Sequence, residues 1–255
     1  MMVEERLDWI LSRLRLENRV TVDEEVKSLG VSADTARRDF DRLAGMNKAV
    51  RTHGGIILPE HEENLVPLTS LRVRNAENVE QKRRIAEAAV ELLGSDDTVV
   101  IDAGSTAYQV ARLLGDRSCT VLAYSLDIAN VALEHERVQL VFAGGIVRRE
   151  TQCAVGEETV AMISRFRANI ALIGANGISV EHGVMTPNHM EASVKRAIMG
   201  MADRLVLLAD SSKINRRALS RFADLTDFEI LITDDGIDAG TADRIREVGV
   251  RLIIV

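Results

Sequence analysis

The stretch Val99 to Leu114, V-V-I-D-A-G-S-T-A-Y-Q-V-A-R-L-L, shows how the larger part of this chain is organised. Its β-branched start has the length and composition of a buried parallel strand that stops at Asp102. After a loop of small residues, Val110, Leu113 and Leu114 recur at helical spacing. A strand followed directly by a helix is the repeating unit of α/β folds, which bind ligands at the carboxyl edge of the sheet.

The loop Ala103–Thr106 has the residue types of an anion-binding turn. Gly104 permits close approach of the backbone, the free amides of the first helical turn extend to Ala107, and Ser105 and Thr106 add hydroxyl donors. These groups together suit a phosphate. The loop has no Lys and no G-x-G-x-x-G pattern, so it matches neither a nucleoside-triphosphate nor a dinucleotide fingerprint. The alternative is an ordinary strand-to-helix turn in which Ser105 or Thr106 is the N-cap.

Composition limits the classes of protein to consider. The chain has 255 residues, 46% of them hydrophobic, which is enough for a large core and a small second domain. Its net charge of -7 argues against a globally basic nucleic-acid binder, although a small DNA-reading module can be hidden in an acidic average. No apolar run reaches the ~18 residues of a membrane span, and the N-terminus lacks a targeting pattern, which predicts a cytoplasmic protein.

The cysteine and histidine spacings do not indicate a metal or a cofactor. Cys119 and Cys153 are far apart and form no C-x-x-C pattern, so neither a disulfide framework nor a zinc site is expected. The five histidines show no H-x-x-x-H spacing. We therefore expect two packed thiols, no metal and no cofactor.

The N-terminal region has the pattern of a helix-turn-helix. An apolar stripe from Leu7 to Leu14 predicts a first helix that ends near Asn18. The capping-box spacing of Thr21-Val22-Asp23-Glu24 predicts a second, short helix, which Gly30 can end in the left-handed conformation. A third helix follows after a tight turn, and in helix-turn-helix proteins this element enters the major groove.

The third predicted helix has an apolar and a basic face. Ser32 is its expected N-cap, and Ala36, Phe40 and Leu43 form the apolar face. The opposite face carries Thr35, Arg37, Arg38 and Arg42. Asp34, Asp39 and Asp41 share this helix and could simply pair with the arginines, and on charge alone a solvated surface is the better interpretation.

The next stretch, Lys48 to Ile57, predicts two short strands around a turn, which is the wing of a winged helix. Lys48 and Arg51 can reach phosphate from it, and His53 lies beside the turn.

These residues resemble the DNA-binding signature of the DeoR family of bacterial sugar-metabolism regulators, in which S-x-x-T-x-R-R-D precedes an R-x-H-G-G wing. The matching stretches are V-S-A-D-T-A-R-R-D-F, from Val31 to Phe40, and R-T-H-G-G, from Arg51 to Gly55. Ala36 and Phe40 stand where the family usually has Ile and Leu. The resemblance implies contacts with double-stranded operator DNA from Ser32, Thr35, Arg37, Arg38, Arg42, Lys48, Arg51 and His53.

The rest of the chain predicts a linker and an α/β domain. The stretch from Leu58 to Asn75 contains prolines and acids with little periodicity, as linkers do. The expected domains are therefore a winged helix-turn-helix in 1–58, a linker in 59–75 and a sensor domain in 76–255. A helical pattern resumes at Ala76, with Val79 on its apolar side and Gln81-Lys82-Arg83-Arg84 on its polar side.

Short apolar runs then alternate with helical patterns. The expected strands are 120–123, 139–142, 170–173, 204–208, 229–233 and 251–255, and the expected helices include 128–134, 157–163, 191–202 and 239–247. This alternation predicts a mostly parallel sheet with helices on both faces.

Polar or Gly-rich stretches follow five of the predicted strands, at the edge where ligands collect. They also resemble the DeoR-type sensor domain, including its E-A-x-x-K-R helix at Glu191–Arg196 and its D-x-S-K motif at Asp210–Lys213. Tyr124 occupies the place of the usual Asn. The resemblance implies an effector site built from Asp102, Gly104, Ser105, Thr106, Ala107, Tyr124, Gly144, Gly145, Asn176 and Lys213. Asp102 is expected to take sugar hydroxyls, because a carboxylate repels a phosphate.

Three functions are compatible with the predicted fold. A sugar-phosphate isomerase-like enzyme is the first alternative, since ribose-5-phosphate isomerase has a similar G-S-T loop. Isomerisation needs a carboxylate base near the substrate carbon, yet Gly174-Ala175-Asn176-Gly177 has none, and Glu191 is more simply an i, i+4 partner of Lys195. A scaffold without a ligand is disfavoured by the phosphate loop. We therefore expect a non-enzymatic repressor, a homodimer or homotetramer, that a phosphorylated sugar or related metabolite releases from operator DNA.

Overall fold

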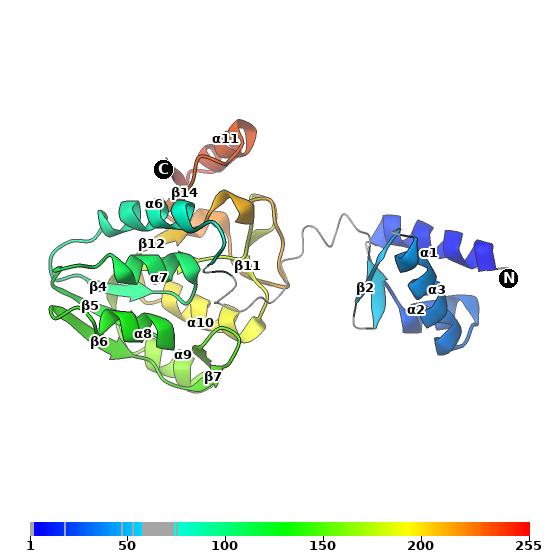
Figure 1. Ribbon diagram of the computed structural model, residues 1–255, viewed down its shortest axis with the longest axis horizontal. Helices are drawn as coiled ribbons and strands as arrows, with labels where there is room; N and C mark the ends of the chain where they lie inside the picture. Colours follow the sequence, from blue (N-terminus) through cyan, green and yellow to red (C-terminus); the bar gives the residue numbers. More distant parts are fainter. Residues whose placement is uncertain (1–2, 18, 47, 53, 58–73, 75) are drawn as a thin grey trace. The chain divides into compact units, whose positions relative to one another are not determined.

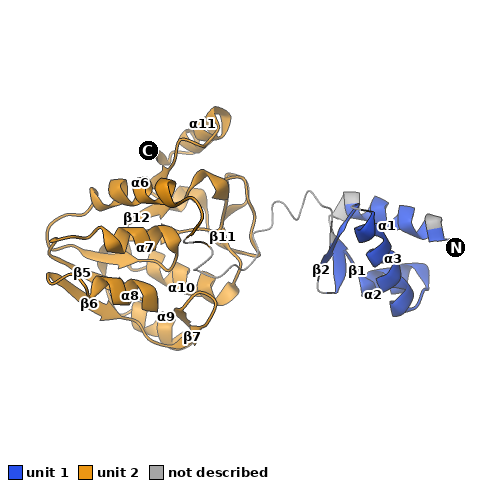
Figure 2. Ribbon diagram, in the orientation of Figure 1, with its two compact units in different colours: residues 1–65 blue, residues 66–255 orange. Residues whose placement is uncertain are grey.

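The computed structural model describes residues 3–17, 19–46, 48–52, 54–57, 74 and 76–255. The chain divides into two compact units, Met1–Leu65 and Val66–Val255 (Figure 2). The predicted linker, 59–75, lies outside the described residues apart from Arg74. Each unit is therefore considered separately.

The smaller unit has the predicted three helices and wing. Its elements in order are α1 (Val3–Glu17), β1 (Arg19–Thr21), α2 (Val22–Leu29), α3 (Ala33–Gly45), β2 (Val50–Thr52) and β3 (Gly55–Ile57). Thr21 and Glu24 form the predicted capping box at the start of α2, and Gly30 ends the helix with a φ of 65°. These caps confirm the local signals because each depends on residues only a few positions apart.

The core of the smaller unit lies between the helices and the wing. Phe40 and Ile56 are fully buried in it, together with Ile10 and Leu14 of α1. β1 pairs with β3, which gives a three-stranded sheet of order β1-β3-β2. We did not predict β1, because its three residues follow α1 without any alternation and its partners are more than thirty residues further along the chain.

The larger unit has helices on both faces of a parallel sheet. Its helices are α6 (Val79–Val90), α7 (Ser105–Arg112), α8 (Leu126–Ala132), α9 (Glu157–Ile163), α10 (His189–Met199) and α11 (Ala239–Glu247). The strands of the sheet are β4 (Thr98–Ile101), β5 (Cys119–Ala123), β6 (Val138–Phe142), β9 (Ala168–Gly174), β12 (Ala202–Leu208), β14 (Ile230–Thr233) and β15 (Arg251–Ile254). These elements confirm the predicted α/β alternation.

The seven strands are parallel and have the order β15-β14-β12-β9-β4-β5-β6. The connections run outward in opposite directions from β4 and β9, so the strand order reverses between these two strands. Open α/β sheets bind ligands in the crevice at this point. The loop that follows β4, Ala103–Thr106, lies there.

Alternate residues of each strand face opposite helical layers. In β4, Val99 and Ile101 pack with residues of α6, α7 and α8, whereas Val100 packs with residues of α9, α10 and α11. Figure 1 shows α6, α7 and α8 together over one face of the sheet. Both faces are buried, which explains the continuous apolar runs in the sequence.

Short antiparallel strands complete the larger unit and were not predicted. They are β7 (Ile146–Arg148) with β8 (Cys153–Val155), and β10 (Gly177–Ser179), β11 (Gly183–Thr186) and β13 (Ser220–Ala223). Each has only three or four residues, so no alternating pattern is long enough to stand out.

Two predictions for α6 were wrong. Val79 is 49% exposed, and Lys82, expected on the polar face, is only 2% exposed. Lys82 is buried because its ammonium donates to the backbone carbonyls of Arg74 and Glu77, at the start of the unit. These bonds compensate for the lost hydration of the charge, although burial still lowers the pKa of Lys82.

Candidate functional site

The exposed face of α3 is basic. Arg37, Arg38 and Arg42 are exposed on it, and Thr35 is half-buried. Ser32 begins the helix, and its hydroxyl accepts a hydrogen bond from the amide of Thr35 at 3.2 Å. The predicted residues therefore share one face of the helix that follows the turn.

The three acids of α3 have different partners and do not neutralise this face. Asp34 pairs with Arg37 at 3.0 Å, and Asp41 pairs with Arg51 at 3.0 Å. Asp39 is buried and pairs instead with Arg6 of α1 at 2.6 Å. The solvated-surface alternative required these acids to pair with the arginines of α3, and only Asp34 does so.

Three of the predicted basic DNA contacts are exposed and available to a ligand. Arg38, Arg42 and Lys48 are exposed, and none of them has an ion-pair partner among the residues that the structure describes. Arg51 is held more closely, because its guanidinium lies 5.5 Å from the centre of the Phe40 ring. His53, the remaining predicted DNA contact, lies outside the described residues.

Glu25 is a buried acid that the sequence analysis did not identify. This residue of α2 is fully buried beside Asp39 and Arg6, and neither oxygen of its carboxylate has a hydrogen-bond partner within the described part of the chain. Burial, with the neighbouring charge of Asp39, raises the pKa of Glu25 from 4.5 to about 7. The smaller unit thus contains an acid that titrates near neutral pH.

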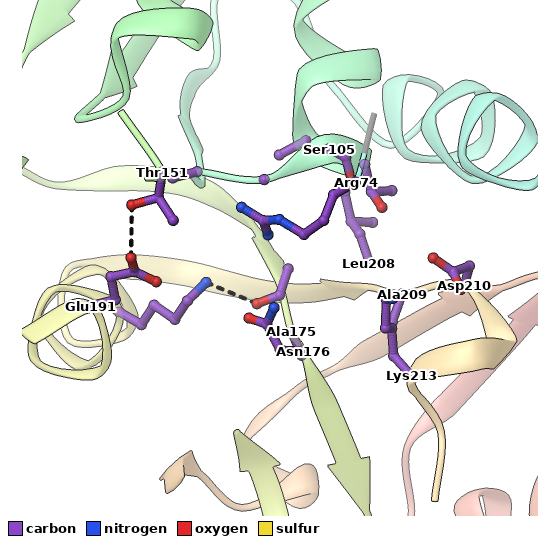
Figure 3. A pocket seen from close by; sticks show the side chains of 16 residues that line it. Arg74, Ser105, Thr151, Ala175, Asn176, Glu191, Leu208, Ala209, Asp210 and Lys213 are labelled. Carbon is purple, nitrogen blue, oxygen red and sulfur yellow. Dashed lines mark hydrogen bonds between the residues drawn. The ribbon is translucent and has the colours of Figure 1, made fainter. Parts of the chain in front are cut away.

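In the larger unit, a pocket lies at the carboxyl ends of β4, β9 and β12 (Figure 3). Six of the predicted effector residues line it: Gly104, Ser105, Thr106, Ala107, Asn176 and Lys213. The pocket therefore unites the start of α7 with residues that follow two other strands, Asn176 and Lys213, which are about 70 and 110 positions further along the chain.

The start of α7 presents free donors to this pocket. Gly104 is the N-cap and supplies no side chain to the amides of the first turn. The amides of Ser105, Thr106 and Ala107 and the hydroxyls of Ser105 and Thr106 have no hydrogen-bond partner among the described residues. Unpaired amides at a helix N-terminus favour an anion.

Four predicted residues do not line the pocket: Asp102, Tyr124, Gly144 and Gly145. The carbonyl of Gly144 accepts a hydrogen bond from Thr159 at 2.9 Å. Gly145, with a φ of 151°, lies so close to Thr159 that an added Cβ would be 2.0 Å from its hydroxyl. These two glycines pack the turn before β7 against α9.

Asp102 lies beneath the pocket, where protein groups occupy its carboxylate. One oxygen accepts from the phenol of Tyr124, and the other accepts from the ammonium of Lys195 and from the amide of Gly174 at 2.8 Å. Tyr124 is fully buried, and burial raises its pKa well above the ordinary value. Tyr124 is therefore a neutral donor that helps to orient Asp102.

The expected pairing of Glu191 with Lys195 was wrong. Lys195 pairs with Asp102, whereas Glu191 pairs with Arg148 of β7 at 2.6 Å and accepts from Thr151 at 2.8 Å. Residues four apart on a helix can meet, but here both side chains are buried and find closer partners on other elements. Glu191 and Lys195 both line the pocket.

Arg74 is a lining residue that sequence reasoning missed. Figure 3 shows its side chain extending between Ser105 and Thr151 on one side and Ala175 on the other. Its buried Nε has no hydrogen-bond partner among the described residues, and no described acid pairs with its guanidinium. A guanidinium held in this way favours a bound anion.

Hydrogen bonds hold the chain next to Arg74. The backbone carbonyl of Arg74 accepts a hydrogen bond from the ammonium of Lys82. The side-chain amide of Asn78 donates to the carboxylate of Asp210 at 3.0 Å. Arg74 and Asn78 lie before α6, so helical periodicity gave no signal that would place Arg74 at the pocket.

No helix in the described part of the chain is long and apolar enough to span a membrane. The described residues also contain no group of three or more His, Cys, Asp or Glu side chains that could hold a metal ion. Cys119 and Cys153 are both buried and unpaired, and burial raises the pKa of Cys153 to about 12. Cys153 is therefore a thiol and not a thiolate at neutral pH.

A winged helix-turn-helix with a basic exposed face, in one chain with an α/β unit that has a pocket at the carboxyl ends of its strands, is the architecture of a transcriptional regulator with a sensor domain. Comparison with known families agrees with this assignment. Residues 6–62 match the DeoR-like helix-turn-helix domain, and residues 77–235 match the DeoR C-terminal sensor domain. The chain belongs to the DeoR family of transcriptional regulators, whose members are not enzymes.

Characterised relatives resemble the chain over nearly its whole length. The HTH-type transcriptional repressor GlcR of Bacillus subtilis is 33% identical over 98% of this chain and 96% of its own length. The glycerol-3-phosphate regulon repressor of Escherichia coli K12 is 30% identical over 90% of each chain. Among solved structures, a ribose 5-phosphate isomerase from Methanocaldococcus jannaschii matches 54% of this chain and 55% of its own, with 19% identity and a TM-score of 0.41.

Proposed function

We propose that this regulator represses an operon for sugar or carbohydrate use and that a phosphorylated sugar or related metabolite releases it from operator DNA. The observation that carries this proposal is the pocket after β4. There, free amides at the start of α7 lie with two cations, Arg74 and Lys213, neither of which pairs with an acid in the described residues. Such a group of donors suits a phosphate dianion.

The phosphate is placed on the amides of Ser105 to Ala107, with the hydroxyl of Thr106 and the cations of Arg74 and Lys213 completing its shell. The acids of the pocket, Glu191 and Asp210, would repel a phosphate at close range. The sugar is therefore placed towards Glu191 and Asn176. The unused amide donors of Asn176 and the positioned carboxylate of Glu191 can bind its hydroxyls.

We assign Asp102 a supporting role, and not the direct contact with sugar hydroxyls that we expected from the sequence. Its oxygens already accept three hydrogen bonds from Tyr124, Lys195 and Gly174. We infer that Asp102 positions the ammonium of Lys195 at the pocket. An indirect role is also assigned to Gly144, Gly145 and Tyr124, which support the walls of the pocket.

The geometry of the acids gives no support to the isomerase alternative. The loop Gly174-Ala175-Asn176-Gly177 has no carboxylate, and Glu191 is tied to Arg148 and Thr151. These partners occupy the carboxylate of Glu191, so it is not free to remove a proton from a substrate carbon. We expect no turnover of pentose or hexose phosphates by the purified chain.

The remaining parts of the proposal concern DNA and assembly. Operator DNA binds the exposed face of α3 and the wing, with contacts from Ser32, Thr35, Arg37, Arg38, Arg42, Lys48, Arg51 and His53. Residues 59–75 link this unit to the sensor unit. Operators with two half-sites require a symmetric homodimer or homotetramer. The protein is proposed to act in the cytoplasm.

Fluorescence anisotropy of labelled operator DNA tests the function. Phosphorylated sugars should weaken operator binding by ~5 to 150-fold, whereas the corresponding unphosphorylated sugars should have no effect. Thr106→Asp places a negative charge at the phosphate position and should abolish this response while leaving operator affinity intact. Ser164→Asp, which adds the same charge at an exposed position after α9, is the control. An unchanged dose curve for Thr106→Asp would contradict the proposed phosphate site.

A further inference from the structure

The hairpin of β7 and β8 presents a free strand edge. β8 is enclosed on its other side, because the amide of Ala154 donates to the carbonyl of Tyr124 at 2.7 Å and Cys153 bridges to Ser125. Within the described residues, no strand lies beside the outer edge of β7. The free amides and carbonyls of such an edge can pair with another strand.

The side chains at this edge are apolar and exposed. Ile146 is 68% exposed and Val147 is 40% exposed. Because they are consecutive in a strand, they point to opposite faces, so both faces of the edge are apolar. Edge strands that remain alone in solution usually carry lysine, proline or inward-pointing charges. The one charge of β7, Arg148, points inward but is neutralised by Glu191 of the same chain, and Ile146 and Val147 stay apolar.

An apolar groove between α9 and α10 belongs to the same surface. Gly156, Val160, Ala161 and Met190 line it, and Met190 is 37% exposed. The hairpin is joined to both helices, because Thr159 of α9 donates to Gly144 and Arg148 of β7 pairs with Glu191 of α10. Figure 1 shows β7 and α9 at the same end of the larger unit.

The charged side chains of this surface are complementary to one another but do not pair within one chain. Arg149, in the turn of the hairpin, is exposed, and so are Glu157 and Glu158 in the first turn of α9. None of the three has an ion-pair partner among the described residues. A two-fold rotation brings the arginine of one copy towards the acids of the other, which is the complementarity that an isologous interface requires.

We propose that this surface, formed by β7 and the groove between α9 and α10, binds a second copy of the chain through antiparallel pairing of the two β7 strands. The two-fold axis passes near Val147, the central residue of the strand. Pairing satisfies the backbone groups of both edges and removes Ile146 and Val147 from water. It also supplies the two-fold symmetry that a helix-turn-helix protein needs to read two half-sites.

Disulfide trapping tests the position of the axis. In antiparallel strands, the Cα atoms of directly opposed residues are ~4.5–5.5 Å apart, which is within the range that a disulfide can span. Val147→Cys should therefore give a covalent dimer after mild oxidation of the full chain, and the native cysteines, which are buried, should not. Leu219→Cys, at a 77% exposed position just before β13, measures the rate of random collision. Equal trapping of the two variants would overturn the proposed pairing.

Sedimentation velocity of the full chain, without DNA or effector, provides the second measurement. The double substitution Ile146→Glu and Val147→Glu should raise the dimer dissociation constant by roughly 100-fold or more, because it buries charge against charge. Both side chains are exposed in one copy, so the melting temperature should stay unchanged when the protein is monomeric. Leu219→Glu is the matched control.

A monomeric wild-type chain, or a dimer that the double substitution does not weaken, would overturn the proposal. Either result would leave this surface to a different partner. Since neither DNA nor effector is present, such a failure is distinguishable from a failure of the proposed repressor function.

Discussion

Lys195 of α10 donates a hydrogen bond to Asp102 at the end of β4, 93 positions earlier in the chain. Both side chains are buried, and the same ammonium donates to the carbonyl of Gly174, the last residue of β9, at 2.9 Å. The pair thus joins a helix to the two strands between which the strand order reverses. It forms the floor beneath the proposed effector pocket.

Loss of one member of this pair should destabilise the larger unit. Lys195→Met leaves the carboxylate of Asp102 buried without its counter-charge, so we expect ~3–5 kcal/mol less stability in urea unfolding followed by circular dichroism. Adding Asp102→Asn should recover part of this loss, because the remaining side chain is neutral. Trp9, the single tryptophan, lies in the smaller unit, and its fluorescence transition should not move. Equal losses in the single and double variants would contradict a specific ion pair.

Arg38 should contribute to operator recognition. Its guanidinium is exposed on α3 without a described partner, so Arg38→Ala should cost ~1–3 kcal/mol of operator affinity and relax sequence preference if it reads a base edge. Lys48→Ala, in contrast, should weaken all DNA sequences alike and reduce the salt slope by ~1. Anisotropy titrations at several salt concentrations separate the two effects. Arg204→Ala, in the sensor unit, is the control and should change neither.

Arg74 should bind the phosphate of the effector. Its guanidinium lies in the pocket with an unpaired Nε, so Arg74→Met should remove a charge-assisted hydrogen bond worth ~1.5–3 kcal/mol, or at least ~10-fold in effector affinity. Calorimetric titration with the sugar phosphate that releases the operator measures this change. Arg117→Met removes an arginine of the same unit outside the pocket and serves as the comparison. Equal affinities in these two variants would remove Arg74 from the site.

Glu25 should make the stability of the DNA-binding unit depend on pH. Its pKa is about 7 in the folded chain against an ordinary value of 4.5. Below pH 4.5 the acid is protonated in both states, and as pH rises through 7 the folded state alone must bury a charge. Stability should therefore fall between about pH 4.5 and 7 and stay low above it.

Glu25→Gln, which is neutral at every pH, should remove most of this dependence. We expect it to raise the stability of the smaller unit by ~1–3 kcal/mol at pH 8 and to change it little at pH 4. Trp9 fluorescence during urea unfolding reports on this unit. Glu24→Gln is not a suitable control because Glu24 forms the capping box, whereas Asp23→Asn changes an exposed acid of the same turn. A pH profile that survives in Glu25→Gln would assign the dependence to another group.

Local patterns in the sequence were sufficient for most of the fold. The capping box at Thr21, the left-handed end at Gly30 and the N-cap at Ser32 depend on residues within one helical turn. The strands of the parallel sheet are buried on both faces, so each appears as a continuous apolar run. The strand–loop–helix unit that begins at Val99 likewise located the start of α7, where we propose that a phosphate binds.

The same patterns could not identify which distant side chains share a pocket. Arg74 lies in a stretch whose composition predicts a linker, and only the packed unit brings its guanidinium beside Ser105. The spacing of Glu191 and Lys195 predicts a helix pair, yet both side chains are buried, and each is close to an opposite charge on another element.

The sequence by itself determined the helices, the parallel strands, their caps and the family signature, because these depend on periodicity and on neighbours a few residues away. Only the tertiary structure decided the partners of the buried charges. An ionised side chain removed from water must find a counter-charge or hydrogen bonds wherever the chain places them, at any separation in sequence. For Asp102, Lys195, Glu191 and Arg148, that separation is between 43 and 93 residues.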